Sequence, residues 1–197
     1  MTAQSTTLMT AEEYLAFERA SETKHEFYDG AVLAMVGASY AHNLISMNTS
    51  VSLYVQFEGK PCRVLPRDMR VAVQTANSFV YPDITVVCGP PQFGYGSPDT
   101  LLNPTVVIEI LSSSTESDDR GRIFQLYRTI DSLQEYLLVT QDTPRIEHFV
   151  RQSNNLWLLS ESLGLESTMH LPAIDCELAL ARVYRDVELP DRPGRSE

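Results

Sequence analysis

An acidic residue lies in the middle of a segment that is otherwise entirely apolar. Residues 106–111 read Val-Val-Ile-Glu-Ile-Leu, which is typical of a buried β-strand, and Glu109 lies inside it. An ionised carboxylate is too costly to bury there without a partner, so Glu109 must be paired, protonated or bound to a metal ion.

A second acid, Asp83, lies at the start of another apolar run, residues 81–87. Side chains alternate across a sheet, so Val107, Glu109 and Leu111 are expected to share one face. If the two strands are neighbours, Asp83 and Glu109 can both reach one ion. Hard divalent cations prefer carboxylate oxygens, so the two acids predict a divalent-cation site.

Length and composition fit one folded domain. The chain has 197 residues, of which 43% are hydrophobic, enough for a full core. We expect a single domain over residues 1–197, with a frayed tail at 189–197. No apolar run approaches the ~20 residues of a membrane span, and no signal-peptide pattern is visible, so a cytoplasmic location without membrane contact is expected.

Charge and cysteine content narrow the function classes. The net charge of −11 argues against strong nonspecific binding of nucleic acid. It does not exclude an enzyme that acts on nucleic acid, because cations bound at an acidic site change the local electric field. The chain has only two lysines, Lys24 and Lys60. Its three cysteines, Cys62, Cys88 and Cys176, show no Cys-x-x-Cys spacing, so we expect buried free thiols and neither structural zinc nor a disulfide framework.

Local patterns predict the first elements of the chain. Thr10 to Glu13 form a capping box for a short helix that ends near Ala20. Asp29-Gly30 joins two strand-like runs as a hairpin. The spacing of four apolar residues predicts a helix over about residues 40–57, and these residues are Leu44, Met47, Val51 and Tyr54.

The rest of the chain reads mainly as strands. They are expected at residues 62–65, 69–73, 79–88, 105–111, 135–139, 145–150 and 155–160, with a loop at 89–103 and a short helix near 177–184. After the strand at 105–111 come a turn at 112–114 and a helix over about 117–130. A strand–helix–strand unit predicts that its two strands are parallel and that the helix packs on the sheet.

An ordered set of short motifs resembles the Uma-type restriction endonuclease family of the PD-(D/E)XK nuclease superfamily. The motifs are His25-Glu26-Phe27-Tyr28-Asp29-Gly30, Ala41-His42-Asn43, Arg67-Asp68-Met69-Arg70-Val71, Pro82-Asp83, Glu109-Ile110-Leu111-Ser112, Ser114-Thr115, Asp119-Arg120-Gly121 and Ser132-Leu133-Gln134-Glu135-Tyr136. The resemblance covers nearly the whole chain. It implies an α/β (α+β) fold with a restriction endonuclease-like core, in which helices flank a mixed β-sheet.

The resemblance also implies metal-dependent hydrolysis of DNA phosphodiester bonds. Asp83 and Glu109 match the metal-binding acids of the family, and Glu26 matches an acid near the N-terminus of its pattern, so all three are expected metal ligands and catalytic residues. Mg²⁺ (or Mn²⁺) is the expected ion, because it binds through a few carboxylates and activates water. Nucleases of this fold often act as homodimers, which makes a homodimer one of the expectations.

One position departs from the family pattern. The usual superfamily lysine would fall at Leu111, and the Uma-type lysine on the following helix would fall at Ile123. At 100° per residue, Arg120 lies about 60° and Arg122 about 100° from position 123, so Arg120 is the expected substitute. An arginine can stabilise phosphate charge but cannot act as a general base. Lys24, reaching in from the hairpin, is the alternative.

Other interpretations of the same residues stay open. The chain can be a catalytically inactive nuclease-fold module that binds nucleic acid or protein partners. In a purely structural interpretation Glu109 pairs with an arginine, Asp83 is a turn residue, Glu26 is a solvated acid, and metal affinity is absent. We expect His42 to be a helix cap or surface contact, and Tyr127 to lie in the core.

Restoring a lysine at position 123 tests whether Ile123 weakens catalysis. We expect Ile123→Lys to raise metal-dependent cleavage of plasmid DNA above that of the wild type. Lysine would return a cation near the reacting phosphate. If a folded, metal-loaded variant shows no gain, position 123 is not the defect.

Overall fold

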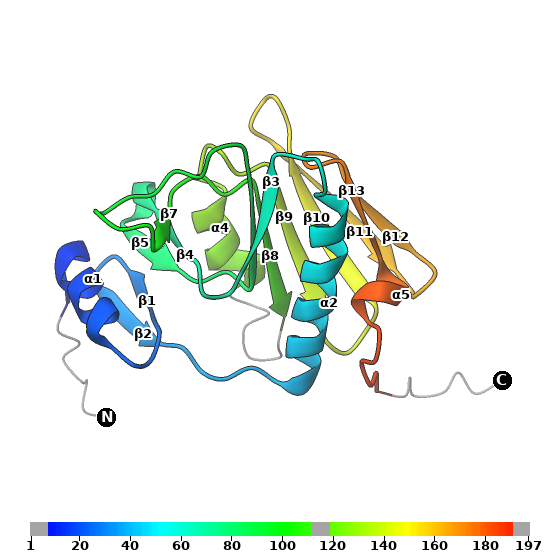
Figure 1. Ribbon diagram of the computed structural model, residues 1–197, viewed down its shortest axis with the longest axis horizontal. Helices are drawn as coiled ribbons and strands as arrows, with labels where there is room; N and C mark the ends of the chain where they lie inside the picture. The colour runs from blue at the N-terminus through cyan, green and yellow to red at the C-terminus, as the bar shows by residue number, and fades with distance from the viewer. Residues whose placement is uncertain (1–7, 112–118, 191–197) are drawn as a thin grey trace.

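The computed structural model describes residues 8–111 and 119–190. In this part of the chain the strands form a six-stranded sheet, a five-stranded sheet and a two-stranded ribbon, with the orders β11-β10-β9-β8-β6-β3, β2-β1-β5-β4-β7 and β12-β13. Figure 1 shows the five-stranded sheet beside α1 and the six-stranded sheet beside α2. The turn predicted at 112–114 and the start of the helix predicted at 117 lie outside the described residues.

The elements follow the chain in a fixed order. The strands are β1 (His25–Tyr28), β2 (Ala31–Ala34), β3 (Cys62–Pro66), β4 (Arg70–Val73), β5 (Ser78–Val80), β6 (Ile84–Cys88), β7 (Thr100–Leu101), β8 (Val106–Leu111), β9 (Glu135–Thr140), β10 (Arg145–Arg151), β11 (Trp157–Leu163), β12 (Thr168–Leu171) and β13 (Cys176–Ala179). The helices are α1 (Ala11–Ala20), α2 (Tyr40–Gln56), the 3-10 turn η1 (Gln74–Ala76), the π-helical turn η2 (Asp119–Ile123), α4 (Phe124–Tyr127) and α5 (Leu180–Val183).

The N-terminal prediction is confirmed in its local chemistry. The hydroxyl of Thr10 accepts a hydrogen bond from the Glu13 N–H, and the Glu13 carboxylate accepts one from the Thr10 N–H. Asp29 and Gly30 of the hairpin turn have φ values of 44° and 101°. Both are positive, as a type I′ turn requires of its two central residues. The β1–β2 hairpin then pairs with β5 in the five-stranded sheet.

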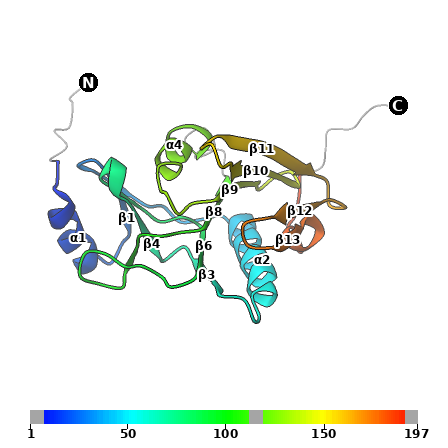
Figure 2. The ribbon, with the colours of Figure 1, turned by 90° about the horizontal axis from the view of Figure 1, so that it is seen from above.

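The six-stranded sheet has a separate core on each face. Ile45 and Leu53 of α2 belong to the core on one face, and Ile123 and Tyr127 belong to the core on the other. Figure 2 shows α2 and α4 on opposite sides of the sheet. As predicted, β8 and β9 are parallel neighbours. The alternation of β8 places Val107 with the Tyr127 core.

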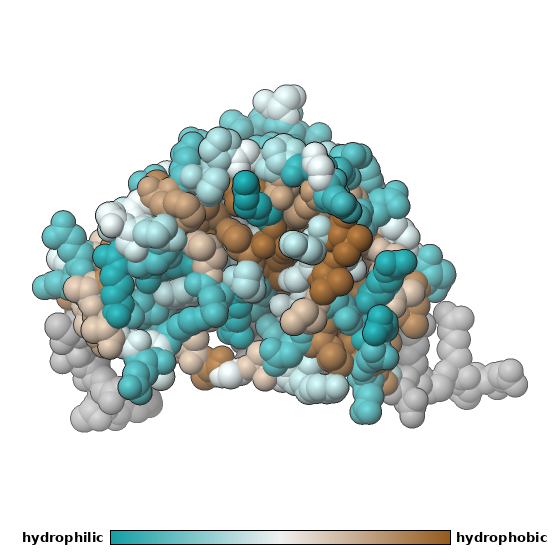
Figure 3. Space-filling model, viewed as in Figure 1, coloured by the Kyte–Doolittle hydropathy of each residue, from teal (hydrophilic) through white to brown (hydrophobic). Residues whose placement is uncertain are grey.

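The helix predicted over about residues 40–57 is confirmed as α2, but the apolar residues whose spacing predicted it do not form its buried side. The helix buries Ile45, Thr49 and Leu53, whereas Met47 and Val51 keep 63% and 52% of their surface exposed. Figure 3 shows hydrophobic surface over α2 on this face of the molecule. Helix α2 contains no Asp, Glu, Lys or Arg, so charged residues do not mark the side that faces solvent. Apolar residues occur on two sides of the helix, and packing against the sheet decides which side is buried.

Three predicted segments have different bounds in the structure. The strand expected at 79–88 divides into β5 and β6, which belong to different sheets and are separated by Tyr81, Pro82 and Asp83. The loop expected at 89–103 contains β7, which pairs with β4. The helix expected near 177 begins only at Leu180, because β13 first pairs with β12.

The expectation of free thiols is wrong for two of the three cysteines. Cys62 and Cys88 form a disulfide between β3 and β6, whereas Cys176 is a buried free thiol. The antiparallel register places the two cysteines opposite each other, and their separation in sequence contains no sign of this. Disulfides are uncommon in the cytosol, so this bond lends no support to the predicted cytoplasmic location, which stays a prediction.

Three further predictions concern membrane contact, domain number and the C-terminal tail. No described helix combines the length and apolar character needed to cross a membrane. The single domain over residues 1–197 stays a prediction. Most of the tail predicted at 189–197 lies outside the described residues, and Leu189, its first residue, packs against the α2 side of the core.

The two stripes of α2 give a test of the fold. We expect Leu53→Ala to lower the free energy of unfolding by about 2–5 kcal/mol, because a fully buried side chain leaves a cavity. Val51→Ala, two residues away and half exposed, should change it by less than about 0.5 kcal/mol. Urea denaturation measures both values, and equal losses would contradict this orientation of α2.

Candidate active site

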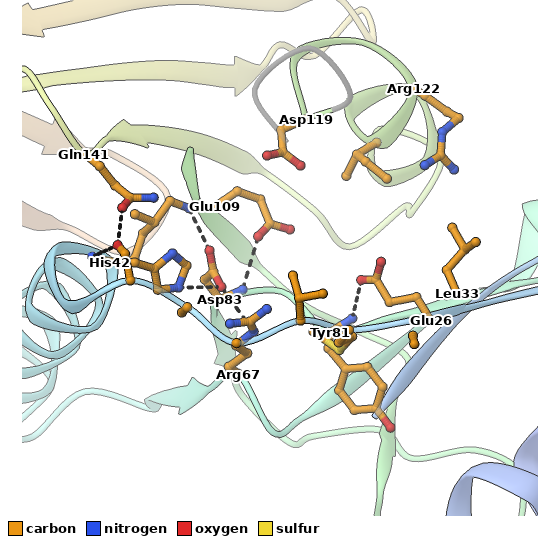
Figure 4. Close-up of a pocket in the computed structure, with 18 of the residues that line it drawn as sticks. Glu26, Leu33, His42, Arg67, Tyr81, Asp83, Glu109, Asp119, Arg122 and Gln141 are labelled. Atoms are coloured by element: carbon orange, nitrogen blue, oxygen red, sulfur yellow. Dashed lines mark hydrogen bonds and ion pairs between the residues drawn. The ribbon is translucent and has the colours of Figure 1, made fainter. Parts of the chain in front are cut away.

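A pocket of about 460 Å³ lies where the two large sheets meet. The β1–β2 hairpin, the segment before α2, the junction between β5 and β6, strand β8 and the helical segment 119–127 all contribute to its walls. Figure 4 shows the carboxylates of Glu26, Asp83, Glu109 and Asp119 directed toward this cavity. The pocket therefore brings together the three acids predicted from sequence and adds a fourth.

Asp83 occupies the position just before β6. Its Oδ2 accepts a hydrogen bond of 2.8 Å from the Ile110 N–H. Its Oδ1 lies 3.1 Å from Nε2 of His42 and 3.5 Å from Nε of Arg67. The carboxylate is thus buried with cationic or hydrogen-bonding partners on both oxygens, as the cost of burying a charge requires.

Glu109 lies directly across from Asp83, because the register that pairs Ile84 with Ile108 continues by one residue. Its Oε2 accepts a hydrogen bond of 3.2 Å from the Asp83 N–H, and its Oε1 accepts one of 2.8 Å from the Tyr127 hydroxyl. Strands β6 and β8 are thus neighbours, as the hypothesis of a shared cation site requires.

The environment of Glu109 disfavours its charged form. The residue keeps some exposure as part of the pocket wall, but protein atoms surround its carboxylate. This burial raises the pKa of Glu109 well above its ordinary value, and the negative charges of Asp83 and Asp119 raise it further. Such a carboxyl group favours a proton or a cation at its side.

Glu26 reaches the pocket from β1 of the five-stranded sheet. Its Oε2 accepts a hydrogen bond of 2.7 Å from the Tyr28 hydroxyl, and its Oε1 accepts one of 3.2 Å from the Tyr81 N–H. Burial raises the pKa of Tyr28, with the Glu26 charge as the next cause, so the phenol stays a donor. Glu26 is therefore a fixed acceptor and not the solvated surface acid of the alternative interpretation.

The helical segment after β8 separates its two arginines. Arg122 lines the pocket together with Asp119 and Ile123, so the position expected to hold lysine does face the cavity. Arg120 instead donates to the Glu147 carboxylate on β10, with Nε–Oε2 and Nη2–Oε1 distances of 3.1 and 2.6 Å. It is not among the described residues that line the pocket.

Both lysines have partners elsewhere. Lys24 forms an ion pair with Asp68, and Lys60 forms one with Asp175. Neither is among the described residues of the pocket wall. Lys24 therefore does not reach in from the hairpin in this conformation.

The pocket wall includes His42, Arg67 and Arg122, which are not among the predicted catalytic residues and metal ligands. His42 and Arg67 flank Asp83, and Arg122 faces Glu26 across the cavity. The His42 backbone N–H donates a hydrogen bond of 3.0 Å to the hydroxyl of Ser39, the N-cap of α2, so the position of His42 at the start of this helix was a usable signal. Arg67 follows the edge strand β3, and only the pairing of β3 with β6 brings it beside Asp83.

This arrangement gathers the side chains of four acidic residues, Glu26, Asp83, Glu109 and Asp119, in one pocket. Among the described residues, no three His, Cys, Asp or Glu side chains converge tightly enough to form a metal site in this conformation. The carboxylates are nonetheless oriented by backbone and tyrosine donors, and they provide the hard oxygen ligands that divalent cations prefer. The geometry defines a candidate site for cation-assisted chemistry on an anionic substrate.

The fold of this chain matches that of a solved structure. The structure superimposes on the crystal structure of "a putative nuclease belonging to DUF820" from Anabaena variabilis ATCC 29413 with a TM-score of 0.72. The sequence identity is 16%, and the match covers 89% of this chain and 97% of that one. This likeness confirms the predicted α/β (α+β) fold class with mixed sheets flanked by helices.

The chain belongs to the Uma2 family, described as "Putative restriction endonuclease", whose model matches residues 11–182. The resemblance stated from sequence is therefore confirmed. Two proteins of Synechocystis sp. (strain PCC 6803) are similar over most of their length. The chain is 35% identical to protein sll1609, covering 83% of this chain and 93% of that protein. It is 31% identical to protein slr1290, covering 90% and 92% respectively.

The raised pKa of Glu109 predicts how stability depends on pH. Between the ordinary value of about 4.5 and the raised pKa, the folded protein binds more protons than the unfolded chain. Without divalent cations, the free energy of unfolding should therefore fall as pH rises through this window, by about 1.4 kcal/mol per unit of pKa difference. Glu109→Gln should flatten this dependence in urea denaturation with EDTA.

A matched substitution controls for the loss of one carboxylate. Glu161 is exposed on β11, where it pairs with Arg145, so Glu161→Gln should retain the pH dependence of the wild type in this window. A Glu109→Gln protein with the wild-type dependence would show that Glu109 is not the group responsible.

Proposed function

We propose that this protein is a metal-dependent DNA endonuclease that hydrolyses phosphodiester bonds, with Asp83 and Glu109 as ligands of a divalent cation. The observation that carries the proposal is the placement of these two acids on neighbouring strands at one pocket. Burial, followed by the charges of Asp83 and Asp119, raises the pKa of Glu109, and a carboxyl group in such a place favours a cation beside it. Membership of the Uma2 family and a nuclease-like fold support the same class of activity.

The donors of the pocket fit Mg²⁺ or Mn²⁺. Magnesium is commonly held through one or two carboxylates, with waters and substrate phosphates completing its shell. Asp83 and Glu109 would supply those carboxylates, and a cation between them would offset the repulsion that raises the Glu109 pKa. When bound, such an ion lowers the pKa of a water and stabilises negative charge on the phosphoryl group.

The chain's own residues hold the two acids in place. The Ile110 N–H orients Asp83, and the Asp83 N–H with the Tyr127 hydroxyl orients Glu109. Because their rotamers are held by hydrogen bonds, the oxygens are positioned before substrate arrives. Glu26 is proposed as the third ligand, and it would exchange its bond to the Tyr28 hydroxyl for the ion.

Other predicted features of the enzyme remain proposals. A catalytic role for Arg120 stays a prediction, and its guanidinium would have to leave Glu147 to reach the substrate. DNA as the substrate and assembly as a homodimer likewise rest on the family.

A second candidate is an inactive nuclease-fold module that binds nucleic acid or a protein without cleaving it. Two observations favour it: Ile123 occupies a pocket position where the resemblance expects lysine, and the net charge is −11. This candidate differs from the first in one measurable respect, because it predicts binding without turnover at any metal concentration.

Cleavage of plasmid and linear duplex DNA with Mg²⁺ or Mn²⁺ tests the proposal. We expect metal-dependent cleavage by the wild type and a loss on the order of 100-fold or more in Asp83→Asn and in Glu109→Gln, because each removes a charge that would hold the ion. Both substitutions preserve side-chain size. Calorimetric titration of the metal should show weakened binding in the same two variants.

Glu161→Gln is the matched control, since it makes the same chemical change on an exposed strand position. It should cleave as the wild type does. Equal cleavage by the wild type and both pocket variants would point to a contaminating nuclease and overturn the assigned ligands. Metal-independent DNA binding without cleavage by any of them would favour the inactive module.

A further inference from the structure

The cationic residues of the pocket lie on different walls. Arg67 lies beside Asp83 on one wall, and Arg122 extends from the helical segment on another (Figure 4). The pocket also holds at least four carboxylates, so an anionic phosphodiester could approach only where a cation offsets them. The position of Arg122 near Glu26 and Asp119 makes it the cation on the wall that the expected lysine would have occupied.

The sequence expectation favoured Arg120, and the difference has a structural cause. Residues 119–123 form a π-helical turn. Asp119, Arg122 and Ile123, which stand at positions i, i+3 and i+4 of this turn, face the pocket. Arg120 points to β10, where its two-point pairing with the buried Glu147 holds it.

The guanidinium of Arg122 lies over the ring of Tyr28. Its central carbon is 4.3 Å from the ring centre. The Tyr28 hydroxyl in turn donates to Glu26, so the ring itself has a fixed orientation. The attraction of the cation to the ring supports the guanidinium at the pocket wall, and the fork of N–H donors of a guanidinium matches the oxygens of a phosphate.

We propose that Arg122 is the phosphate-binding cation of this pocket, contacting a phosphodiester oxygen of bound DNA in place of the lysine that the resemblance expects at position 123. The inference rests on the proposed function for its substrate class. Arg122 stabilises negative charge on the phosphate and transfers no proton, because a guanidinium stays protonated. Tyr28 is a positioning residue, since it acts by holding the guanidinium.

Binding of a duplex oligonucleotide, measured by fluorescence anisotropy at several salt concentrations, tests this role without requiring turnover. Ca²⁺ replaces Mg²⁺ in these titrations. Arg122→Ala should weaken binding about 10-fold and reduce the slope of log K against log[salt] by about 1, because one phosphate contact is lost. Arg122→Gln, which preserves hydrogen bonding but removes the charge, should reduce the slope similarly.

Two further variants test whether the change in DNA affinity depends on the position of the charge and on its support by Tyr28. Arg128→Ala removes the same charge at the exposed end of α4, away from the pocket, and should leave affinity and slope unchanged. Tyr28→Leu should weaken binding without changing the slope by a full unit, because the charge remains but the guanidinium loses its support. Thermal unfolding of each variant checks that it is folded.

The outcomes separate this inference from the proposed function. Wild-type binding that is weakened in Arg122→Ala, without cleavage in Mg²⁺ or Mn²⁺, would retain Arg122 as the phosphate contact and reject the nuclease. Wild-type affinity and slope in both Arg122 variants would overturn the inference, even if cleavage is observed. Arg120→Ala is measured in the same titrations, and a loss of affinity confined to this variant would overturn the inference in favour of Arg120. Absence of DNA binding by the wild type would reject both the inference and the proposed function.

Discussion

Two reciprocal hydrogen bonds between strands β6 and β8 fix the geometry on which the pocket depends. The Asp83 N–H donates to the Glu109 carboxylate, and the Ile110 N–H donates to the Asp83 carboxylate. Each acid thus satisfies a backbone donor beside the other acid, where the regular pairing of the strands ends. The same bonds that complete the sheet therefore place two carboxylates together, and burial, followed by the charge of Asp83, raises the pKa of Glu109.

The other walls of the pocket come from elements on both sides of the junction between β5 and β6. The chain crosses from the five-stranded to the six-stranded sheet at Tyr81 and Pro82, and proline, which has no N–H, suits a point where no sheet bond can form. The Tyr81 N–H is available to Glu26, which links the hairpin to the junction. On the opposite side, Tyr127 links the helical segment to Glu109. Tyrosine hydroxyls and backbone amides thus orient three acids from three elements.

Predictions from sequence succeeded where the determining contacts are short in sequence. The capping box at Thr10 and the turn at Asp29 and Gly30 depend on neighbouring residues, and the parallel pairing of β8 with β9 follows from the helical connection between them. They failed where two distant segments decide the outcome. The disulfide between Cys62 and Cys88 depends on the register of β3 with β6, which no local pattern encodes. Packing against the sheet likewise decides which side of α2 is buried.

The sequence by itself determined which chemistry the pocket can offer, because Asp83 and Glu109 stand out as acids within apolar runs whose burial demands a partner. It also determined that lysine is absent from position 123. Only the tertiary structure decided which cations meet those acids. Arg122 lines the cavity, whereas Arg120 pairs with Glu147 on β10, and strand pairing brings Arg67 beside Asp83. The physical reason is that a side chain's type is local, whereas its direction depends on helix geometry and on the register of distant strands.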